Sequence, residues 1–326
     1  SLCFKTFILH VDFLQTGDKM NKSFFQKTIV VWAGALICCA LWGSAFPAIK
    51  TGYILFNIDT KDIPSLLLFA GMRFVIAGTL ALIIGSITSR KLLLPQKGSF
   101  KMIAPLSLLQ TVGQYVFFYI SLANSTGVRS SILNGLNVFI AIIVASLIFK
   151  QEKFTSSKLI GSVIGFAGLV VVCLSTGKFE FSFSLLGDAF MILSSTSNAF
   201  SSVMIKKFSQ KENPIVLSGY QFIMGGFIMI VIGLVAGGRI TTVSPAAVIL
   251  LIYLGCISAV AYSLWGILLK YNNVSRVTVF GFMNQICGVT FSAIFLKEAS
   301  SLNIYCLLAL ALVCVGIILV NRDKNE

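Results

Sequence analysis

Residues 65–87 read SLLLFAGMRFVIAGTLALIIGSI, an apolar run with a single charged side chain, Arg73. A helix needs about 20 such residues to cross the roughly 30 Å of hydrocarbon in a bilayer. The whole chain shares this character, because 57% of its 326 residues are hydrophobic, 11% are charged and the mean hydropathy is +0.94. A water-soluble protein could not cover such a composition with polar surface, and a disordered chain would be richer in charge. The sequence therefore predicts a protein embedded in lipid.

Nine further runs of this kind follow one another with brief connections, so no soluble domain is inserted. The alternation of apolar and polar residues that marks the strands of a membrane barrel is absent. Helices satisfy their own backbone hydrogen bonds in lipid, so we expect a helical bundle. The ten predicted spans are 29–49, 65–87, 102–123, 130–149, 159–175, 185–205, 215–237, 246–269, 277–296 and 302–320.

The chain contains an internal duplication. Residues 71–78 read GMRFVIAG and residues 219–226 read GYQFIMGG, so the first glycine, the phenylalanine and the last glycine are identical. Three further pairs occur in the same order at nearly constant offset: Pro64 with Pro214, which stand before these runs, and after them Tyr115 with Tyr262 and Glu152 with Glu298. These matches predict two copies of a unit of five spans.

Five is an odd number, so the second copy enters the membrane from the opposite side and the halves become inverted repeats. This plan recurs in secondary transporters, whose site lies near the membrane midplane between the repeats. The predicted fold is an all-α integral membrane protein of ten transmembrane helices in two inverted five-helix repeats. Its predicted parts are an N-terminal segment at 1–28, a first repeat at 29–175, a second repeat at 185–320 and a tail at 321–326.

The basic residues are divided unevenly between the two sides of this fold. With the N-terminus in the cytoplasm, 18 lysines and arginines fall on the cytoplasmic side, 6 fall outside and Arg73 lies within a span, which accounts for all 25. This bias follows the positive-inside rule, so both termini are expected in the cytoplasm. The formal net charge of +14 therefore reflects topology, and no nucleic-acid partner is expected.

The start of the chain forms a separate segment. Residues 1–19 hold no membrane-spanning run and no ordered signal peptide, whereas Met20 begins a compact basic leader directly before the first span. We expect Met20 to be the natural start and residues 1–19 to be an extension. His10, the single histidine of the chain, lies in this extension.

Several motifs connect the chain with a known family. The segment WGSAFPAIK at 42–50 resembles the opening signature of the EamA-like family of the drug/metabolite transporter superfamily. The Gly-Met-Arg-Phe run at 71–74, Leu-Gly-Asp at 186–188 and the glutamates Glu152 and Glu298 fit the same pattern. The resemblance covers residues 29–320 and implies ten helices in two inverted repeats. It also implies transport of small organic solutes, such as amino acids, across the bacterial plasma membrane.

Arg73 is the ionisable residue that the sequence places deepest in the membrane. It stands eight residues into its span, about 12 Å from the outer edge at 1.5 Å per residue. Such a residue usually faces the bundle interior or a water-filled cavity. Its guanidinium could bind an anionic or carboxylate group of a substrate, or it could bond helix carbonyls and fix the packing. Gln221 occupies the matching place in the second half.

Amides and aromatic side chains form the second group of candidates. Asn134 and Asn137 are three residues apart on one predicted helix and share a face, and so are Tyr262 and Trp265. Inside a bundle such groups could hold an amino or carboxyl group and an apolar body, or they could serve only interhelical hydrogen bonding. The predicted substrate-binding residues are Arg73, Gln114, Tyr115, Asn134, Asn137, Gln221, Tyr262, Trp265, Asn284 and Gln285.

Trp42 and Pro47 are candidate gating residues on the first span. Proline removes a backbone hydrogen bond and kinks a helix, so Pro47 could act as a hinge beside the site or as a static packing kink. Gly161 and Gly165 form a face of small residues that permits close helix packing. We expect this face to be used inside the chain, although it could also join two copies in a homodimer.

The sequence lacks features that other mechanisms require. No aspartate or glutamate falls near the middle of a predicted span, which disfavours a simple carboxylate proton relay. No P-loop motif is present for ATP binding, and the eight cysteines do not have metal-binding spacings. No cofactor and no metal are therefore expected.

The leading hypothesis is a secondary transporter that exports a small organic metabolite, an amino acid or a related solute, by alternating access. A nucleotide-sugar or sugar-phosphate carrier is the alternative, although such polyanions would favour more than one deep cation. An integral membrane enzyme would need a Ser–His pair, paired aspartates or a metal cluster, and a scaffold would need no polar interior. The substrate, the direction of transport and the coupling ion stay open.

Overall fold

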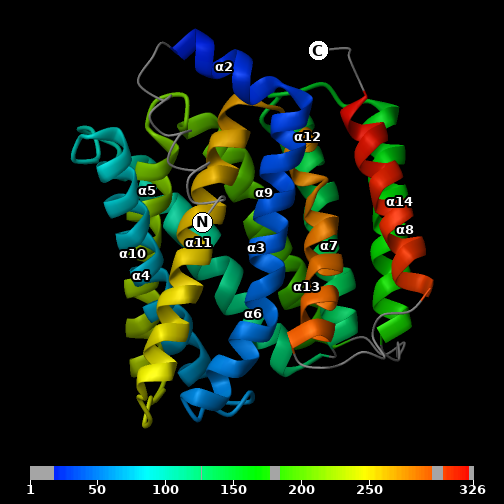
Figure 1. Cartoon of the computed structure of the whole chain (residues 1–326). Coiled ribbons are helices and arrows are strands. Elements are labelled where there is room, and N and C mark those ends of the chain that lie inside the picture. Colours follow the sequence, from blue (N-terminus) through cyan, green and yellow to red (C-terminus); the bar gives the residue numbers. More distant parts are fainter. Residues whose placement is uncertain (1–17, 126, 177–183, 296–303, 323–326) are drawn as a thin grey trace.

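The computed structural model describes residues 18–125, 127–176, 184–295 and 304–322, and within them every regular element is a helix (Figure 1). Most of the predicted N-terminal extension, with His10, lies outside the described residues, and so does Glu298. The five longest helices are α3 (Thr28–Leu55), α4 (Ile63–Ser89), α10 (Pro214–Val235), α11 (Pro245–Tyr271) and α8 (Ser156–Thr176). The other elements are α2 (Asp18–Gln26), α5 (Phe100–Leu106), η2 (Ser107–Gly113), α6 (Gln114–Ala123), α7 (Gly127–Ile143), η3 (Val144–Ile148), η4 (Leu185–Ala189), α9 (Phe190–Phe208), α12 (Val274–Thr278), α13 (Gly281–Phe295) and α14 (Ile304–Asn321).

The predicted spans coincide largely with these helices. Within the described residues, six helical stretches have the length and hydropathy to cross a membrane, and α8 and α14 hold shorter apolar stretches. The six are Thr28–Leu55, Ile63–Ser89, Phe100–Ala123, Ser130–Ile148, Pro214–Val235 and Pro245–Tyr271. The prediction of an all-helical chain with membrane-spanning helices is thus confirmed, and the count of ten stays a prediction.

Three of the long helices begin at the same local signal. A polar side chain accepts a hydrogen bond from a backbone N–H of the first turn, which would otherwise have no partner. Proline follows within that turn, where its missing N–H costs nothing. The capping residues are Asp62 before α4, Asn213 before α10 and Ser244 before α11.

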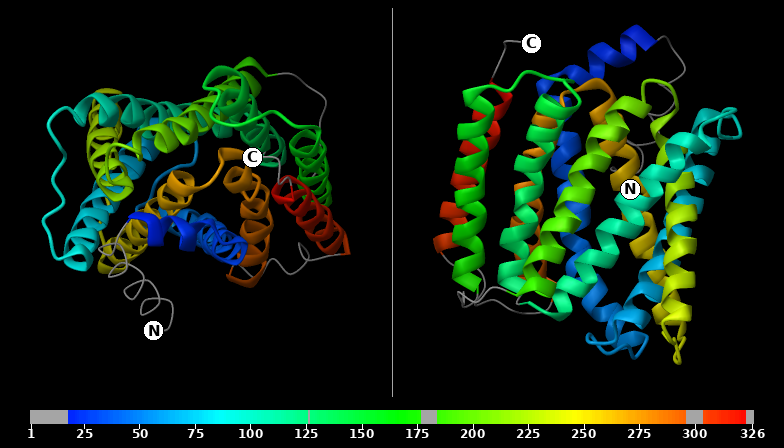
Figure 2. Two further views of the ribbon diagram at one scale, coloured as in Figure 1. Left: turned by 90° about the horizontal axis from the view of Figure 1, so that it is seen from above. Right: turned by 180° about the vertical axis from the view of Figure 1, so that it is seen from behind.

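The helices pack mainly in pairs that join the first half of the chain to the second. α4 lies along α10 at one edge of the molecule, and α8 lies along α14 at the opposite edge (Figure 2). Between these edges α3 packs against α11 and α13, while α9 packs against α6 and α7. Neither half therefore covers its own apolar faces, and the core belongs to both.

Glycine backbones bring α4 and α10 into direct contact. A Cβ added at Gly71 would lie 2.7 Å from the carbonyl oxygen of Gly226, and a Cβ at Gly226 would lie 2.7 Å from that of Gly71. Gly78 and Gly219 approach each other in the same way at the other end of this contact. Such small-residue interfaces allow the van der Waals packing that holds helices together in lipid.

The face of small residues on α8 is used within the chain. A Cβ at Gly161 would lie 2.8 Å from the carbonyl oxygen of Gly316 on α14, and one at Gly165 would meet the ring of Phe282 on α13 at 2.7 Å. These contacts provide the internal packing that the sequence favoured. The homodimer stays a prediction.

The third predicted span is not a uniform α-helix, because its middle, η2, is π-helical. Pro105 precedes it in α5 and removes one backbone hydrogen bond there. Single π-helical turns inside α-helices are frequent at functional sites. Here the π-helical turn places two buried polar side chains, Gln110 and Thr111, toward α10.

Candidate functional site

A cluster of aromatic rings lies where α3, α4, α6, α10 and α11 meet. The Trp42 ring centroid is 5.0 Å from that of Tyr262 and 5.0 Å from that of Trp265. This contact unites the predicted gating residue Trp42 with two predicted binding residues. We name the central aromatic cluster by its members, which are Trp42, Phe74, Tyr115, Phe222, Tyr262 and Trp265.

The contacts within this cluster occur in matched sets. Phe74 packs on Tyr115 with 4.6 Å between centroids, and Phe222 packs on Tyr262 with 4.9 Å. The two phenylalanines stack on each other at 5.2 Å, and the two tyrosine hydroxyl oxygens are 2.9 Å apart. Tyr262 follows Tyr115 by 147 residues, and Phe222 follows Phe74 by 148. Residues at matching positions of the two halves therefore make the same contact and also meet each other.

Arg73 is buried on α4 and reaches across to α11. Its side chain is 3% exposed, and Nε and Nη2 donate to Ser258 Oγ at 3.2 and 2.9 Å. The guanidinium carbon lies 5.1 Å from the ring centroid of Phe74, in the geometry of a cation–π contact. The structural role left open by the sequence is thus met by a side-chain hydroxyl rather than by helix carbonyls.

Gln221, the counterpart of Arg73, makes a matching contact from the second half to the first. Its Oε1 accepts a hydrogen bond from Thr111 Oγ1 at 2.7 Å, and its Nε2 donates to Gln110 Oε1 at 3.0 Å. Gln221 follows Arg73 by 148 residues, and Ser258 follows Thr111 by 147. Each pair joins the two halves, and the arginine–serine pair corresponds by the repeat to the glutamine–threonine pair; of the two, only the first carries charge.

The positive charge of Arg73 has no carboxylate beside it among the described residues. The carboxylates whose side chains the structure describes, Asp59, Asp62, Glu152, Asp188 and Glu212, lie at helix ends or in connections. Arg73 is instead within electrostatic range of three tyrosines, which are Tyr53, Tyr119 and Tyr262. A buried cation without an anion is costly, and its described partners here are the Ser258 hydroxyl and the Phe74 ring.

Four polar atoms of the predicted binding and gating residues are buried without a hydrogen-bond partner in the described chain. They are Trp42 Nε1, Gln114 Oε1, Asn137 Oδ1 and Asn284 Oδ1. Gln114 also contacts the hydroxyl of Tyr262, which connects it to the central aromatic cluster. Asn284 follows Asn137 by 147 residues, so these two again occupy matching positions. Buried polar atoms of this kind need water or a ligand to offset their desolvation.

The remaining predicted residues are less closely connected to the cluster. Asn134 lies on α7, where its backbone carbonyl accepts a hydrogen bond from Ser195 Oγ at 3.4 Å. Gln285 stands next to Asn284 on α13. α7 and α13 pack against each other, but the described contacts do not join Asn134 or Gln285 to the aromatic rings. Their binding roles stay predictions.

Pro47 lies inside α3, which continues from Thr28 to Leu55 without a break. Thr51 Oγ1 donates to the Pro47 carbonyl at 3.0 Å. One turn earlier, a Cβ at Gly43 would lie 2.5 Å from Cys287 Cβ, so this part of α3 packs directly on α13. The hinge role of Pro47 stays a prediction.

Four residues of the site were not among the sequence candidates. Phe74 and Phe222 stand at an identical position of the two copies, so the repeat itself marks them. Ser258 and Thr111 are hydroxyl residues at matching positions, but hydroxyl residues are common in apolar spans and did not stand out. In the described chain no group of three or more histidine, cysteine, aspartate or glutamate side chains could hold a metal ion.

The tyrosine pair can be tested by a double-mutant cycle. Tyr115→Phe and Tyr262→Phe each remove the hydroxyl contact, so the double variant should lose less stability than the sum of the single losses. We expect a coupling of about 0.6 kcal/mol, the average for hydrogen bonds between membrane helices. Equilibrium unfolding in mixed detergent micelles would measure it. Strictly additive losses would contradict the contact.

Comparison with known proteins identifies the family. A model of the EamA-like transporter family matches residues 28–174 and again residues 185–322. The chain belongs to the EamA-like transporter family. The family and the apolar helices together make it a multi-pass membrane protein with a small-molecule substrate, in agreement with the resemblance noted in the sequence.

Curated relatives of this EamA-like protein carry transporter names. An uncharacterized transporter of Archaeoglobus fulgidus is 26% identical over 304 residues, which cover 90% of this chain and 99% of the relative. The uncharacterized transporter YvbV of Bacillus subtilis is 27% identical over 271 residues, 79% of this chain and 83% of the relative. A WAT1-related chloroplastic protein of Arabidopsis thaliana is 25% identical over 313 residues, 92% of this chain and 72% of the relative. These names point to transport rather than to enzymatic activity.

A solved structure shares the fold. One crystal structure superposes with a TM-score of 0.72 at 14% sequence identity and covers 91% of this chain and 99% of its own. At this identity the likeness concerns the fold alone. The shared fold extends over nearly the whole length of both chains.

Proposed function

We propose that this EamA-like protein is a secondary transporter that exports a small organic metabolite, an amino acid or a related solute, across the plasma membrane by alternating access. The observation that carries the proposal is the pair of matched contacts at the centre of the bundle. Arg73 with Ser258 and Gln221 with Thr111 both join the two halves, and the repeat relates one pair to the other. Between them the Tyr115 and Tyr262 hydroxyls meet.

These contacts support two inverted five-helix repeats. A two-fold axis between the halves would bring each residue on the axis beside its own counterpart, as for Phe74 with Phe222 and for the tyrosine pair. The helix pairs follow the same rule, because α4 packs on its counterpart α10 and α8 on its counterpart α14. Two nearly equivalent halves can exchange inward- and outward-facing roles, which is the basis of alternating access in such folds.

The side chains at the centre suit a substrate with two opposite charges and an apolar body. Arg73 offers donors to a carboxylate. The unpartnered oxygens of Gln114, Asn137 and Asn284 accept hydrogen bonds and so suit an ammonium group. The central aromatic cluster provides apolar surface beside Arg73 and Gln114. An amino acid combines these features in one small molecule.

The charge distribution supports an orientation with both termini in the cytoplasm. α2, α12 and the C-terminal end of α14 lie at one end of the bundle (Figure 1). We call this the basic end. Most of the lysines and arginines of the connections belong to this end by sequence, which follows the positive-inside rule.

The proposal can be tested with purified protein in liposomes. Labelled amino acids, a nucleotide-sugar and a sugar-phosphate would be screened for flux, each with and without a pH gradient. We expect flux of at least one amino acid or related zwitterion above that of empty liposomes. Flux of the phosphorylated compounds alone would favour the alternative cargo. No flux of any metabolite from well-folded protein would contradict the transporter.

A further inference from the structure

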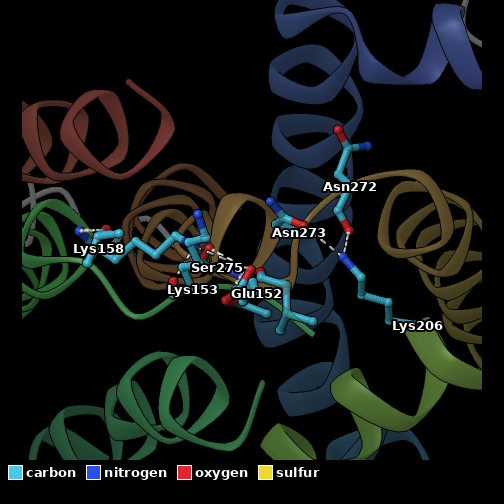
Figure 3. A network of polar contacts seen from close by, with 10 residues as sticks. Glu152, Lys153, Lys158, Lys206, Asn272, Asn273 and Ser275 are labelled. Carbon is cyan, nitrogen blue, oxygen red and sulfur yellow. Dashed lines mark hydrogen bonds and ion pairs between the residues drawn. The ribbon is translucent and has the colours of Figure 1, made fainter. Parts of the chain in front are cut away.

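A buried polar contact joins the two halves of the chain at the basic end (Figure 3). Glu152 lies in the connection between η3 and α8, and its carboxylate accepts hydrogen bonds from Ser275. The Ser275 backbone N–H donates to Oε1 at 3.2 Å, and Ser275 Oγ donates to Oε2 at 3.0 Å. Ser275 belongs to the first turn of α12, so a side chain of the first half binds the start of a helix of the second.

The charge of Glu152 is neutralised within its own half. Lys158 Nζ lies 3.7 Å from Oε2, and the side chains of Lys158 and Glu152 are 3% and 0% exposed. Lys158 Nζ also donates to the backbone carbonyl of Lys153 at 2.8 Å. A buried ion pair is expensive unless further hydrogen bonds satisfy it. Ser275 supplies two of them, so the carboxylate depends on the contact between the halves.

The connection before α12 is held from a second side. Lys206 at the end of α9 donates from Nζ to the carbonyl of Asn272 at 2.7 Å and to Asn273 Oδ1 at 3.0 Å (Figure 3). Asn272 Nδ2 in turn donates to the backbone carbonyl of Phe25 in α2 at 2.9 Å. α12 is thus fixed in place by α2, α9 and the Glu152 connection together.

The Glu152–Ser275 contact lies at the ends of the two helices that carry the candidate binding residues Asn137 and Asn284. Glu152 follows the helix that carries Asn137, because η3 continues α7. Ser275 precedes the helix that carries Asn284, because α12 leads into α13. Deeper in the bundle these two helices touch, since a Cβ at Gly281 would meet Val138 at 3.6 Å. The Glu152–Ser275 contact therefore holds α7 and α13, the helices of Asn137 and Asn284, together at the basic end of the bundle.

We propose that Glu152 and Ser275 form a cytoplasmic latch, which keeps the basic end closed and must break before the site opens to the cytoplasm. The proposal rests on the transporter function proposed above. Opening at this end requires α12 to move away from η3, and the latch is the buried charged contact between them. The latch therefore stabilises the closed end relative to the open one.

Another buried glutamate at the same end provides a matched comparison. Glu212 accepts hydrogen bonds from Ser99 Oγ and from the backbone N–H of Gln96, so it also joins the two halves. It lies at the start of α10, where α4 and α10 are already in backbone contact through their glycines. α4 and α10 can stay together while α12 moves away from η3. The Glu212 contact is therefore not expected to control access to the site.

Access to a reporter thiol tests the latch without knowledge of the substrate. Val138 on α7 is 1% exposed, and Val138→Cys in a variant without other cysteines would place a thiol between α7 and α13. A membrane-impermeant maleimide would be applied to the cytoplasmic face of inside-out vesicles. Glu152→Gln should raise the labelling rate about tenfold and Ser275→Ala about threefold, because each weakens the closed state. Glu212→Gln should leave the rate unchanged.

Each outcome decides for or against the latch. An unchanged labelling rate in Glu152→Gln would overturn it, and so would an equal increase in Glu212→Gln. If Glu152→Gln does not fold, Ser275→Ala carries the test, because it keeps the buried ion pair and removes one hydrogen bond. An unchanged rate in that variant overturns the proposal as well. Absence of metabolite flux together with the expected labelling would refute the transporter function and leave the latch intact.

Discussion

Arg73→Gln should lower the rate of transport by about thirtyfold or more, while the variant still inserts and folds. Removing one charged partner of a buried polar contact costs about 2–5 kcal/mol, and about 1.4 kcal/mol corresponds to a factor of ten. The fold should survive because Gln221 already pairs with a hydroxyl at the matching position. A glutamine at position 73 facing Ser258 would reproduce this neutral pair. The substrate, in contrast, would lose the buried cation beside the central aromatic cluster.

The measurement is the initial rate of flux in liposomes with equal amounts of protein. Arg239→Gln serves as the control, because it makes the same chemical change at an exposed position beyond α10. We expect this control to transport at nearly the original rate. A well-expressed Arg73→Gln protein with normal flux would show that the arginine serves packing alone.

Gly226→Leu should prevent the native packing of α4 on α10. A Cβ at this position would lie 2.7 Å from the Gly71 carbonyl oxygen and 2.8 Å from the Val75 backbone nitrogen. Both are backbone atoms in a helix, so no side chain can turn aside to make room. Overpacking in a well-packed interior costs about 1–3 kcal/mol and occasionally more, and leucine adds atoms beyond Cβ. We expect a loss of at least about 3 kcal/mol.

The thermal unfolding midpoint of the detergent-purified protein would test this expectation, together with the fraction that elutes as a monodisperse peak. Gly281→Ala is the matched control in another helix, because its Cβ would meet only Val138 at an ordinary 3.6 Å. The control should unfold near the original temperature. A Gly226→Leu protein as stable as the control would show that α4 and α10 are not in backbone contact.

The sequence predicts the positions of the helices well, because hydropathy over some twenty residues follows burial in lipid. It does not predict their local irregularities. In the π-helical η2, Gln110 and Thr111 make contacts with Gln221, more than a hundred residues away. The separation of α12 from α13 within the predicted span 277–296 is similar, since Glu152 binds the start of α12. Hydropathy averaged over a window of residues contains no information on contacts between residues far apart in the sequence.

The candidate site was predictable in part. The repeat aligned Arg73 with Gln221 and Tyr115 with Tyr262, but alignment alone does not say that the two tyrosines touch each other. Ser258 was missed because a serine in an apolar span usually bonds its own helix. The role of Ser258 comes from its hydrogen bond with Arg73, which lies on another helix. Matched offsets of polar residues were therefore more informative than the residue types.

The position of α3 between late segments has a consequence for biosynthesis. Cys38 Sγ donates to the carbonyl of Ala261 at 3.3 Å across 223 residues of sequence, and Cys39 Sγ donates to that of Phe280 at 3.1 Å across 241. At about 5–20 residues per second, α3 waits in the bilayer for about 10–50 s before these partners are synthesised. During that time lipid or a membrane chaperone must cover the surface that α11 and α13 later occupy. The order of tertiary assembly therefore differs from the order of translation, and the earliest of these helices completes its packing among the last.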